Sequence, residues 1–519
     1  MTAAYGTARQ PARRAALAGA AALLGAAAWP GRGWAQTAAA RSTTAAAPVP
    51  TPAPLALHAP LDPADMQADL ALLAEVYGTL HPGLYRYQSP GQFAQRVQAL
   101  HAWAGEPRPL SAWYLALARL TAAVRCGHSY PNPFNQRAPL RSALAAAMRP
   151  LPLRFAWIDG RAIVLGADGD QLAPGSELLA IDGVAMDALA RELLPLARAD
   201  GGNDAKRWSQ LGLIGGERFA AFDLYRALLA GRELPARIAL RVAWPSGAVR
   251  ELELAPAVLP GAPPARFGWS VDIGADRIGH LRLPSWAVFQ NTVAGRFDWQ
   301  PWLEAAVDRL IDERARGLVL DLRGNEGGLD CGDPLLQRLI ERPVQRPAAE
   351  RRVRYRRVPP ALDPVLDTWD NRFRDWGDRI AGEPVDGLYR LLDSGAGAAA
   401  LEPRGRRFGG RVAVLIDAAN SSATMNFAAL IRRNELTSQI ALVGATTGGS
   451  QRGINGNAYF FVRLPRSGVE VDLPLVGVYA AGDPPDAGIA PDVAAPLRVA
   501  DIVAGRDAAL IAATRWVSA

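Results

Sequence analysis

Lysine is almost absent from this chain. Lys206 is the only lysine among 519 residues, so arginine supplies nearly all of the 57 basic side chains. The net charge is +7, but the arginines are spread along the chain instead of gathering in one stretch. A basic charge spread in this way does not indicate a nucleic-acid-binding protein, and we expect no nucleic-acid partner.

Cysteine and histidine are also scarce. The two cysteines, Cys126 and Cys331, and the five histidines do not stand at the spacings of a metal-binding motif, so we expect no metal and no cofactor. Each cysteine lies within a few residues of a motif described below. Two alternatives stay open for them, a Cys126–Cys331 disulfide or two buried free thiols. A catalytic thiol is the less favoured interpretation.

Long apolar runs are missing from the body of the chain, so we expect no membrane-spanning helix and no stable membrane insertion. The N-terminus carries Arg13 and Arg14, followed by a run of small apolar residues. A small residue then stands three positions before, and another directly before, an expected cleavage point after Ala35. This pattern is typical of a secretory signal peptide over residues 1–35. The sequence therefore predicts a periplasmic or secreted protein, with the general and twin-arginine export routes both open.

The rest of the chain divides into segments by composition. Residues 36–60 are rich in Ala, Thr and Pro and predict a linker. Apolar residues at helical spacing predict a helical domain over 61–147. Residues 148–258 begin and end with strand-like runs, enclose a helical insertion, and have a tight Asp182-Gly183 turn. Strands and helices alternate over 265–505, which predicts an α/β layer structure, and 506–519 form a C-terminal tail.

Four motifs lie in the α/β segment, each close to a predicted buried strand. The first is a glycine-rich turn, Asp321–Gly328, whose backbone N–H groups are able to converge on a negative charge. The second runs from Asp417 to Ala428 and places Ser422 where a strand enters a helix. The third is Leu442–Gly449 and the fourth Asp486–Val493. Taken singly, they are equally typical of an ordinary turn or a serine helix cap.

In this order and at this spacing, the four motifs resemble the carboxyl-terminal processing (tail-specific) protease superfamily of serine peptidases, especially its tricorn-core-like branch. The Gly127-His128 pair after a helical segment and the PDZ-like stretch around Asp182-Gly183 match as well. The resemblance implies a multidomain α/β fold with an N-terminal helical domain, a PDZ-like domain and a ClpP/crotonase-like α/β catalytic core. It also implies endopeptidase or carboxyl-terminal processing activity on protein or peptide substrates.

The resemblance assigns roles to individual residues. Aligning the helix start on Asn426 makes Ser422 the nucleophile, with Ser421 as the fallback. The oxyanion donors become the backbone N–H groups of three residues: Gly327, Gly328 and Ala423.

The general base follows from what the chain lacks. Bacterial tail-specific proteases use a lysine after the third motif, where this chain has Ser450, and Lys206 lies far away in the inserted segment. The tricorn-like solution is a histidine, and His128 alone stands in the matching motif. The resemblance places the acid that orients it just before Gly488 of the fourth motif, where Asp486 stands nearest. The fallback acids are Asp483, Glu470 and Glu326.

Two other classes of function remain as alternatives. The same fold without catalysis would make a peptide- or apolar-ligand-binding protein, an interpretation favoured by the missing lysine and the displaced acid. A crotonase-type acyl-CoA enzyme would share the core, but secretion argues against a cytoplasmic cofactor. The sequence does not indicate the substrate, the cleavage preference or the oligomeric state.

Overall fold

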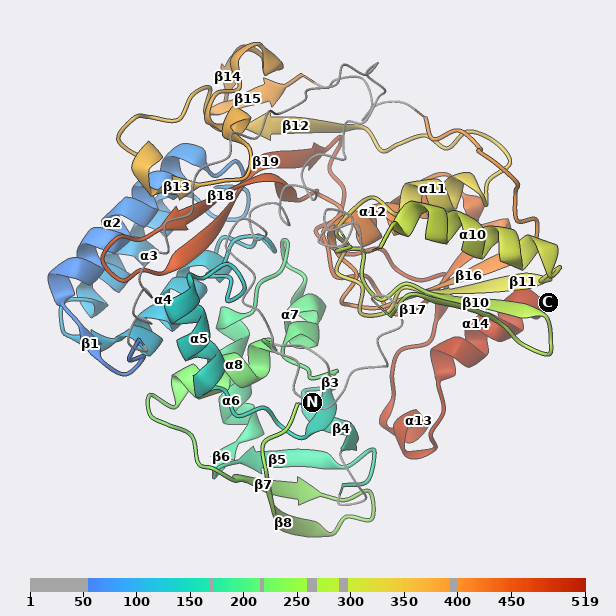
Figure 1. The fold of residues 1–519 in the computed structure, drawn as a ribbon, viewed down its shortest axis with the longest axis horizontal. Coiled ribbons are helices and arrows are strands. Elements are labelled where there is room, and N and C mark those ends of the chain that lie inside the picture. Colours follow the sequence, from blue (N-terminus) through green and yellow to red (C-terminus); the bar gives the residue numbers. More distant parts are fainter. Residues whose placement is uncertain (1–54, 168–171, 215–218, 259–267, 289–296, 393–399) are drawn as a thin grey trace, which may run out of the picture.

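The computed structural model describes residues 55–167, 172–214, 219–258, 268–288, 297–392 and 400–519. The predicted signal peptide and most of the predicted linker lie outside these residues. The described residues form three six-stranded sheets with helices packed against them (Figure 1). Of the helices in this part of the chain, none combines the length and apolar composition needed to cross a membrane.

The first sheet is parallel except at one edge and runs in the order β20-β17-β16-β11-β10-β9. Its strands are β9 (Ser270–Ile273), β10 (Ile278–Arg282), β11 (Gly317–Asp321), β16 (Arg411–Ile416), β17 (Ile440–Gly444) and β20 (Val493–Ala494). Continuous apolar runs form the central strands because both faces of the sheet are covered. Leu318 and Leu320 point into one core and Val319 into the other.

Helices cover both faces of this sheet (Figure 1). One core contains side chains of α10 (Trp299–Asp312), α11 (Gly332–Gln337) and α12 (Ser422–Arg433). The opposite core contains α14 (Ala508–Ser518), which follows the short helix α13 (Val499–Val503). The prediction of an α/β layer structure is confirmed. The prediction that residues 506–519 form a separate C-terminal tail is corrected. Ala513 and Val517 of α14 are buried against the sheet.

The second sheet is antiparallel, in the order β13-β18-β19-β12-β15-β14. Its strands are β12 (Ala349–Val353), β13 (Leu366–Asp367), β14 (Ile380–Val385), β15 (Leu388–Leu391), β18 (Asn455–Arg463) and β19 (Glu470–Ala480). Apolar residues of β18 and β19 share one core with the N-terminal helices. This antiparallel sheet lies inside the segment that was predicted to be simply alternating α/β structure.

The N-terminal part consists of helices with one two-stranded sheet. Its elements are β1 (Pro60–Leu61), α2 (Pro63–Leu80), α3 (Pro90–Trp103), β2 (Arg108–Pro109), α4 (Leu110–Ala122) and α5 (Ala138–Ala147). Asp62 and Ser89 cap α2 and α3 through side-chain oxygens, and each helix begins with a proline, which is favoured there because the first N–H needs no partner.

The third sheet runs β3-β4-β5-β7-β8, with β6 paired to β5. Its strands are β3 (Leu153–Ile158), β4 (Arg161–Ala167), β5 (Glu177–Ile181), β6 (Val184–Ala185), β7 (Ile238–Ala243) and β8 (Val249–Leu254), and the helices between β6 and β7 are α6 (Met186–Leu193), α7 (Asp204–Gln210) and α8 (Ala221–Leu229). Ile181 pairs with Val184 across the turn at Asp182-Gly183, where both residues have positive φ angles. The predicted tight turn is therefore present.

Candidate active site

The predicted nucleophile stands at a strained point of the backbone. Strand β16 ends at Ile416, a short turn follows, and Ser422 is the first residue of α12. Its φ angle is +52°, in the left-handed region, which costs a non-glycine residue about 1–3 kcal/mol. A serine in this conformation at a helix start turns its side chain away from the usual capping position and toward solvent or a ligand.

Ser421 is held differently. Its backbone is extended, with φ −139° and ψ 176°, and no side-chain capping bond is made to the helix. Its hydroxyl donates to the backbone carbonyl of Glu326 over 3.2 Å. The Ser421 side chain therefore ties the nucleophile turn to the glycine turn, and the geometry favours Ser422 over the fallback as the reactive hydroxyl.

The glycine turn after β11 lies directly against Ser422. A Cβ atom on Gly327 would lie 2.9 Å from the Ala423 nitrogen and 3.0 Å from the Ser422 Cβ, and one on Gly328 would lie 2.3 Å from the Trp286 carbonyl group. The φ angles of Gly327 and Gly328 are +95° and +136°. Glycine is required here because both the conformation and the close approach exclude a side chain.

The N–H groups of the two turns divide into occupied and available donors. The Gly327 N–H donates to Asn325 Oδ1 over 2.9 Å, so this predicted oxyanion donor is already engaged. Within the described residues, the N–H groups of Gly328 and Ala423 make no backbone hydrogen bond. Of the three backbone N–H groups predicted to bind the oxyanion, two therefore remain available, those of Gly328 and Ala423.

Two buried asparagines fix the turns to each other. Asn325 donates to the Leu283 carbonyl over 2.7 Å and also accepts from the Thr424 hydroxyl over 2.9 Å. Asn420 donates to the carbonyls of Leu322 and Asn325 over 2.6 and 3.0 Å. Because buried amides satisfied in this way allow little movement, the two available N–H groups keep one orientation relative to Ser422.

His128 reaches the site from the loop after α4. It lines the same cavity of about 310 Å³ as Ser422 and Gly328, and its ring faces that of Tyr459 at a centroid distance of 6.1 Å. Burial lowers the pKa of the imidazole; Asp200 and Glu326 act to raise it, and Arg198 and Lys206 to lower it. A neutral imidazole is the form that accepts a proton from a serine.

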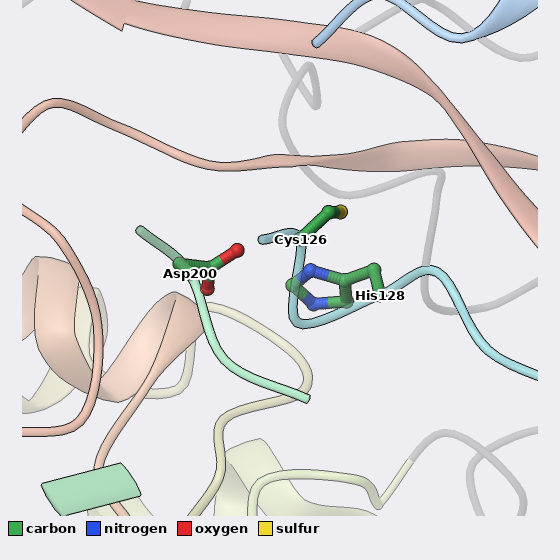
Figure 2. Close-up of side chains that lie close together, drawn as sticks. All are labelled: Cys126, His128 and Asp200. Atoms are coloured by element: carbon green, nitrogen blue, oxygen red, sulfur yellow. The ribbon is translucent and has the colours of Figure 1, made fainter. Parts of the chain in front are cut away.

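The acid beside His128 is Asp200, which the sequence did not indicate. A side-chain oxygen of Asp200 lies within 4.8 Å of a ring nitrogen of His128, and its carboxylate accepts from the Gly127 N–H over 2.9 Å. Figure 2 shows the imidazole beside this carboxylate and close to Cys126. Asp200 is almost fully buried beside the imidazole, and within the described residues no hydrogen bond joins its carboxylate to His128 Nδ1.

The prediction that Asp486 orients His128 is corrected. Its carboxylate accepts from the Ser450 hydroxyl and from the Gly202 N–H, each over 2.8 Å. Asp486 therefore holds the turn that carries Asp200, two residues before Gly202, and acts on His128 only through that turn.

The fallback acids are also placed. Asp483 is exposed and pairs with Arg452 at 3.5 Å. Glu470 is buried and pairs with Arg137 at 3.1 Å. Neither faces His128, whose neighbouring carboxylates are those of Asp200 and Glu326.

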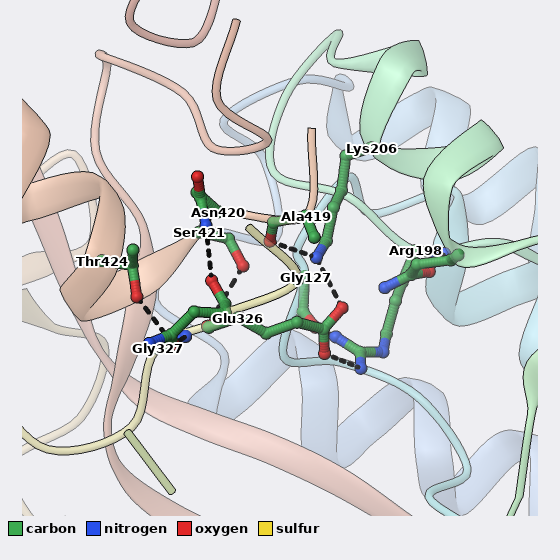
Figure 3. Close-up of polar contacts among 12 residues, drawn as sticks. Gly127, Arg198, Lys206, Glu326, Gly327, Ala419, Asn420, Ser421 and Thr424 are labelled. Atoms are coloured by element: carbon green, nitrogen blue, oxygen red, sulfur yellow. Dashed lines mark hydrogen bonds and ion pairs between the residues drawn. The ribbon is translucent and has the colours of Figure 1, made fainter. Parts of the chain in front are cut away.

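The only lysine of the chain lies in this site. Lys206 of α7 is buried, and its Nζ donates to Glu326 Oε1 over 2.5 Å and to the Ala419 carbonyl over 2.8 Å (Figure 3). Glu326 lies in the glycine turn and Ala419 lies in the turn before Ser422. Burial alone would raise the pKa of Glu326, but Lys206 and Arg198 lower it to about 2. The lysine that sequence reasoning placed far from the site thus holds both turns together.

Arg198 completes the charged group beside His128. Its guanidinium lies 3.7 Å from Glu326 and 4.1 Å from the centre of the Tyr130 ring, and it donates to the Gly127 carbonyl. Gly127 is therefore fixed on both sides, by Asp200 at its N–H and Arg198 at its carbonyl. These contacts set the position of the next residue, His128.

The two cysteines are free and buried. Cys126 belongs to the core of the N-terminal helices and Cys331 to the core of the parallel sheet, so the free-thiol alternative holds and the disulfide does not form. Cys126, His128 and Asp200 lie together, although their spacing in the sequence matches no metal-binding motif.

Comparison with known proteins matches the part of the chain just described. Residues 277–494 match the family model described as peptidase family S41. This stretch contains the glycine turn, Ser422 and the fourth motif. This region of the chain is therefore similar to peptidase family S41. The resemblance to carboxyl-terminal processing proteases is thereby confirmed, and the S41 assignment supports a serine peptidase.

Two solved structures show a similar fold over most of this chain. Mature CPAF complexed with lactacystin is 16% identical, with a TM-score of 0.56 over 88% of this chain and 97% of that chain. Mature CPAF alone is 16% identical, with a TM-score of 0.53 over 85% of this chain and 94% of that chain. The photosystem II D1 C-terminal processing protease is 16% identical at a TM-score of 0.41, covering 86% and 98% of the two chains. No curated protein sequence matches the chain.

Removing the Lys206 ammonium is expected to lower the activity without preventing the protein from folding. Lys206→Met keeps the buried stem but frees Glu326 and the Ala419 carbonyl, so kcat for casein should fall about 10- to 100-fold with a smaller change in KM. Steady-state kinetics would measure this, and thermal unfolding would confirm that the variant is folded. Arg119→Met, which removes an exposed cation, serves as the control. A folded Lys206→Met protein with unchanged kcat would show that the ammonium does not position the turns.

Proposed function

We propose that the protein is an extracytoplasmic serine-type peptidase that cleaves proteins or peptides through an acyl-enzyme on Ser422. The observation that carries the proposal is the left-handed Ser422 backbone at the start of α12, packed against Gly327 and Gly328. It presents a hydroxyl to the cavity that also contains His128.

The mechanism begins with proton transfer from Ser422 Oγ to the His128 imidazole as Oγ attacks the peptide carbonyl carbon. The carbonyl oxygen becomes an oxyanion and accepts hydrogen bonds from the N–H groups of Gly328 and Ala423. The imidazolium then donates its proton to the leaving amine, which departs and leaves an ester on Ser422. Water, deprotonated by His128, hydrolyses that ester and restores the enzyme.

Charge around His128 supports the proposed steps. The carboxylates of Asp200 and Glu326 favour the imidazolium, whereas burial keeps the pKa of the resting group below its usual value. Lys206 and Arg198 offset the negative charge of Glu326. Burial therefore favours the neutral imidazole at rest. The neighbouring carboxylates stabilise its positive charge once the proton from Ser422 is on the ring.

The substrate is proposed to be an extended protein or peptide segment. Aromatic side chains of Trp369, Tyr459 and Phe461 line the cavity beyond Ser422 and offer a surface for an apolar side chain. The predicted PDZ-like segment, residues 148–258, is proposed to hold the peptide by strand addition or by its carboxyl end. The signal-peptide pattern of residues 1–35 supports the proposed extracytoplasmic compartment.

The proposal is tested with an active-site fluorophosphonate and with fluorescently labelled casein. The purified protein is expected to take up one fluorophosphonate per chain and to cleave casein, with cleavage lost as labelling proceeds. A folded protein that neither reacts nor cleaves would support the alternative of a catalytically inactive binding protein. N-terminal sequencing of exported protein should begin at Gln36.

A further inference from the structure

The cluster of Cys126, His128 and Asp200 has the composition of a transition-metal site. One ligand atom of each, a thiol sulfur, a ring nitrogen and a carboxylate oxygen, lies within 4.8 Å of the other two. Figure 2 shows the three side chains close together, with Cys126 and His128 on the loop after α4 and Asp200 on the turn before α7. The Gly127 N–H, bonded to Asp200 over 2.9 Å, fixes the two segments to each other.

One nitrogen of the cluster lacks a hydrogen-bond partner. Within the described residues, His128 Nδ1 is buried and has no hydrogen-bond partner. Buried polar atoms are rarely left in this state, and an orphan at a functional site calls for a ligand or a change of partner. Cys126 and Asp200 are both almost completely buried, so their ligand atoms lie near the imidazole and out of bulk water.

We propose that Cys126, His128 and Asp200 bind a zinc ion that reversibly inhibits the peptidase, an inference that rests on the proposed function for its inhibitory effect. Zn²⁺ favours this mixture of sulfur, nitrogen and oxygen ligands and binds them in a tetrahedron at about 2.0–2.3 Å. Ligand atoms then lie roughly 3.5 Å apart, so the cluster has to contract by only about 1 Å. Water takes the fourth position.

The charges of the ligands match the ion. Zn²⁺ displaces the proton of the Cys126 thiol, which is released to solvent, and binds the resulting thiolate. The thiolate and the Asp200 carboxylate together carry two negative charges, and the imidazole binds in its neutral form. A buried Zn²⁺ centre with these ligands has no net charge, which lowers the cost of removing it from water.

Inhibition follows from the ring nitrogen that is used. A metal on Nδ1 leaves the single imidazole proton on Nε2, so neither nitrogen is free to accept the Ser422 proton. Asp200 is occupied by the same ion. The metal therefore acts on the base and leaves Ser422 itself untouched, unlike an inhibitor that modifies the serine.

The experiment uses the full protein freed of metal with a chelator. Casein hydrolysis is measured against buffered free Zn²⁺, then after adding excess chelator, for the unaltered protein, for Cys126→Ser and for the matched control Cys331→Ser. We expect Zn²⁺ to inhibit the unaltered and control proteins and the chelator to restore activity. Cys126→Ser should keep its metal-free activity and need Zn²⁺ concentrations higher by a factor on the order of 100. Equal inhibition of Cys126→Ser and Cys331→Ser would overturn the proposal.

A spectroscopic measurement separates this proposal from the proposed function. Co²⁺ bound in place of Zn²⁺ gives a thiolate charge-transfer absorption, which is expected in the unaltered and Cys331→Ser proteins and absent from Cys126→Ser. If the protein never cleaves casein but this pattern holds, the metal site stands and the peptidase assignment fails. If casein is cleaved and no thiolate absorption forms, the metal site fails alone. Because the first spectrum needs no variant, misfolding of Cys126→Ser cannot hide the result.

Discussion

Replacing Ser422 with alanine is expected to lower kcat for casein by a factor on the order of 10⁴ to 10⁶, because no other hydroxyl in the left-handed position can form the acyl-enzyme. Fluorophosphonate labelling should disappear in the same variant. Alanine also fits the backbone no worse than serine does, so the thermal unfolding midpoint should change little.

Ser421→Ala is the matched control for this variant. It removes the hydrogen bond from Ser421 to the Glu326 carbonyl, so a loss of up to about 10-fold in kcat is expected from looser turns. Labelling should persist. If labelling instead survived in Ser422→Ala and vanished in Ser421→Ala, the assigned nucleophile would be wrong by one residue.

The second large effect is expected at Asp200. Asp200→Asn keeps the size of the side chain but removes the charge that favours the imidazolium, and kcat should fall by a factor on the order of 10⁴. KM should change little, because the carboxylate faces His128 and not the substrate. Steady-state kinetics on casein would measure both constants.

Asp486→Asn distinguishes the two candidate acids. Asp486 binds Ser450 and Gly202 in a turn that only supports Asp200, so a drop in thermal stability with a loss of less than about 10-fold in kcat is expected. If kcat fell as far in Asp486→Asn as in Asp200→Asn, the role of orienting His128 would return to Asp486. Unchanged kcat in a folded Asp200→Asn protein would remove Asp200 from the mechanism.

The sequence was sufficient to predict the features that are encoded locally. Strands β11, β16 and β17 are apolar runs covered on both faces, and the glycines of the first motif are required by positive φ angles and close backbone contacts. Ser422 could be found for the same reason, since its strand-to-helix turn is built from neighbouring residues. Such features follow from short segments and keep their spacing in the chain.

The charged part of the site could not be predicted because it depends on tertiary contacts. Lys206 and Asp200 lie in a segment that gave no motif, and only the packing of α7 against the catalytic turns brings them to Glu326 and His128. Asp486 lies near the expected position of the acid. Its side chain is shorter than that of a glutamate, and its hydrogen bonds to Ser450 and Gly202 hold it away from His128. The sequence offered one signal for these contacts, its single lysine. A lysine that becomes buried needs a buried partner.

The antiparallel sheet was missed for a related reason. Strands β18 and β19 lie between the third and fourth motifs and join a core made largely by the N-terminal helices. In β18, buried residues alternate with partly buried ones, but nothing in a short window indicates which distant helices cover the strand. Domain boundaries drawn from composition therefore divide residues that share one core.

The long sequence separation between His128 and Ser422 sets the order in which activity arises during biosynthesis. A ribosome completes the His128 loop first, α7 with Lys206 later, and α12 only near the end of translation. A nascent chain that ends before residue 422 thus carries the imidazole without the serine. The proposed site is complete only when α12 packs onto the parallel sheet and the distant segments meet.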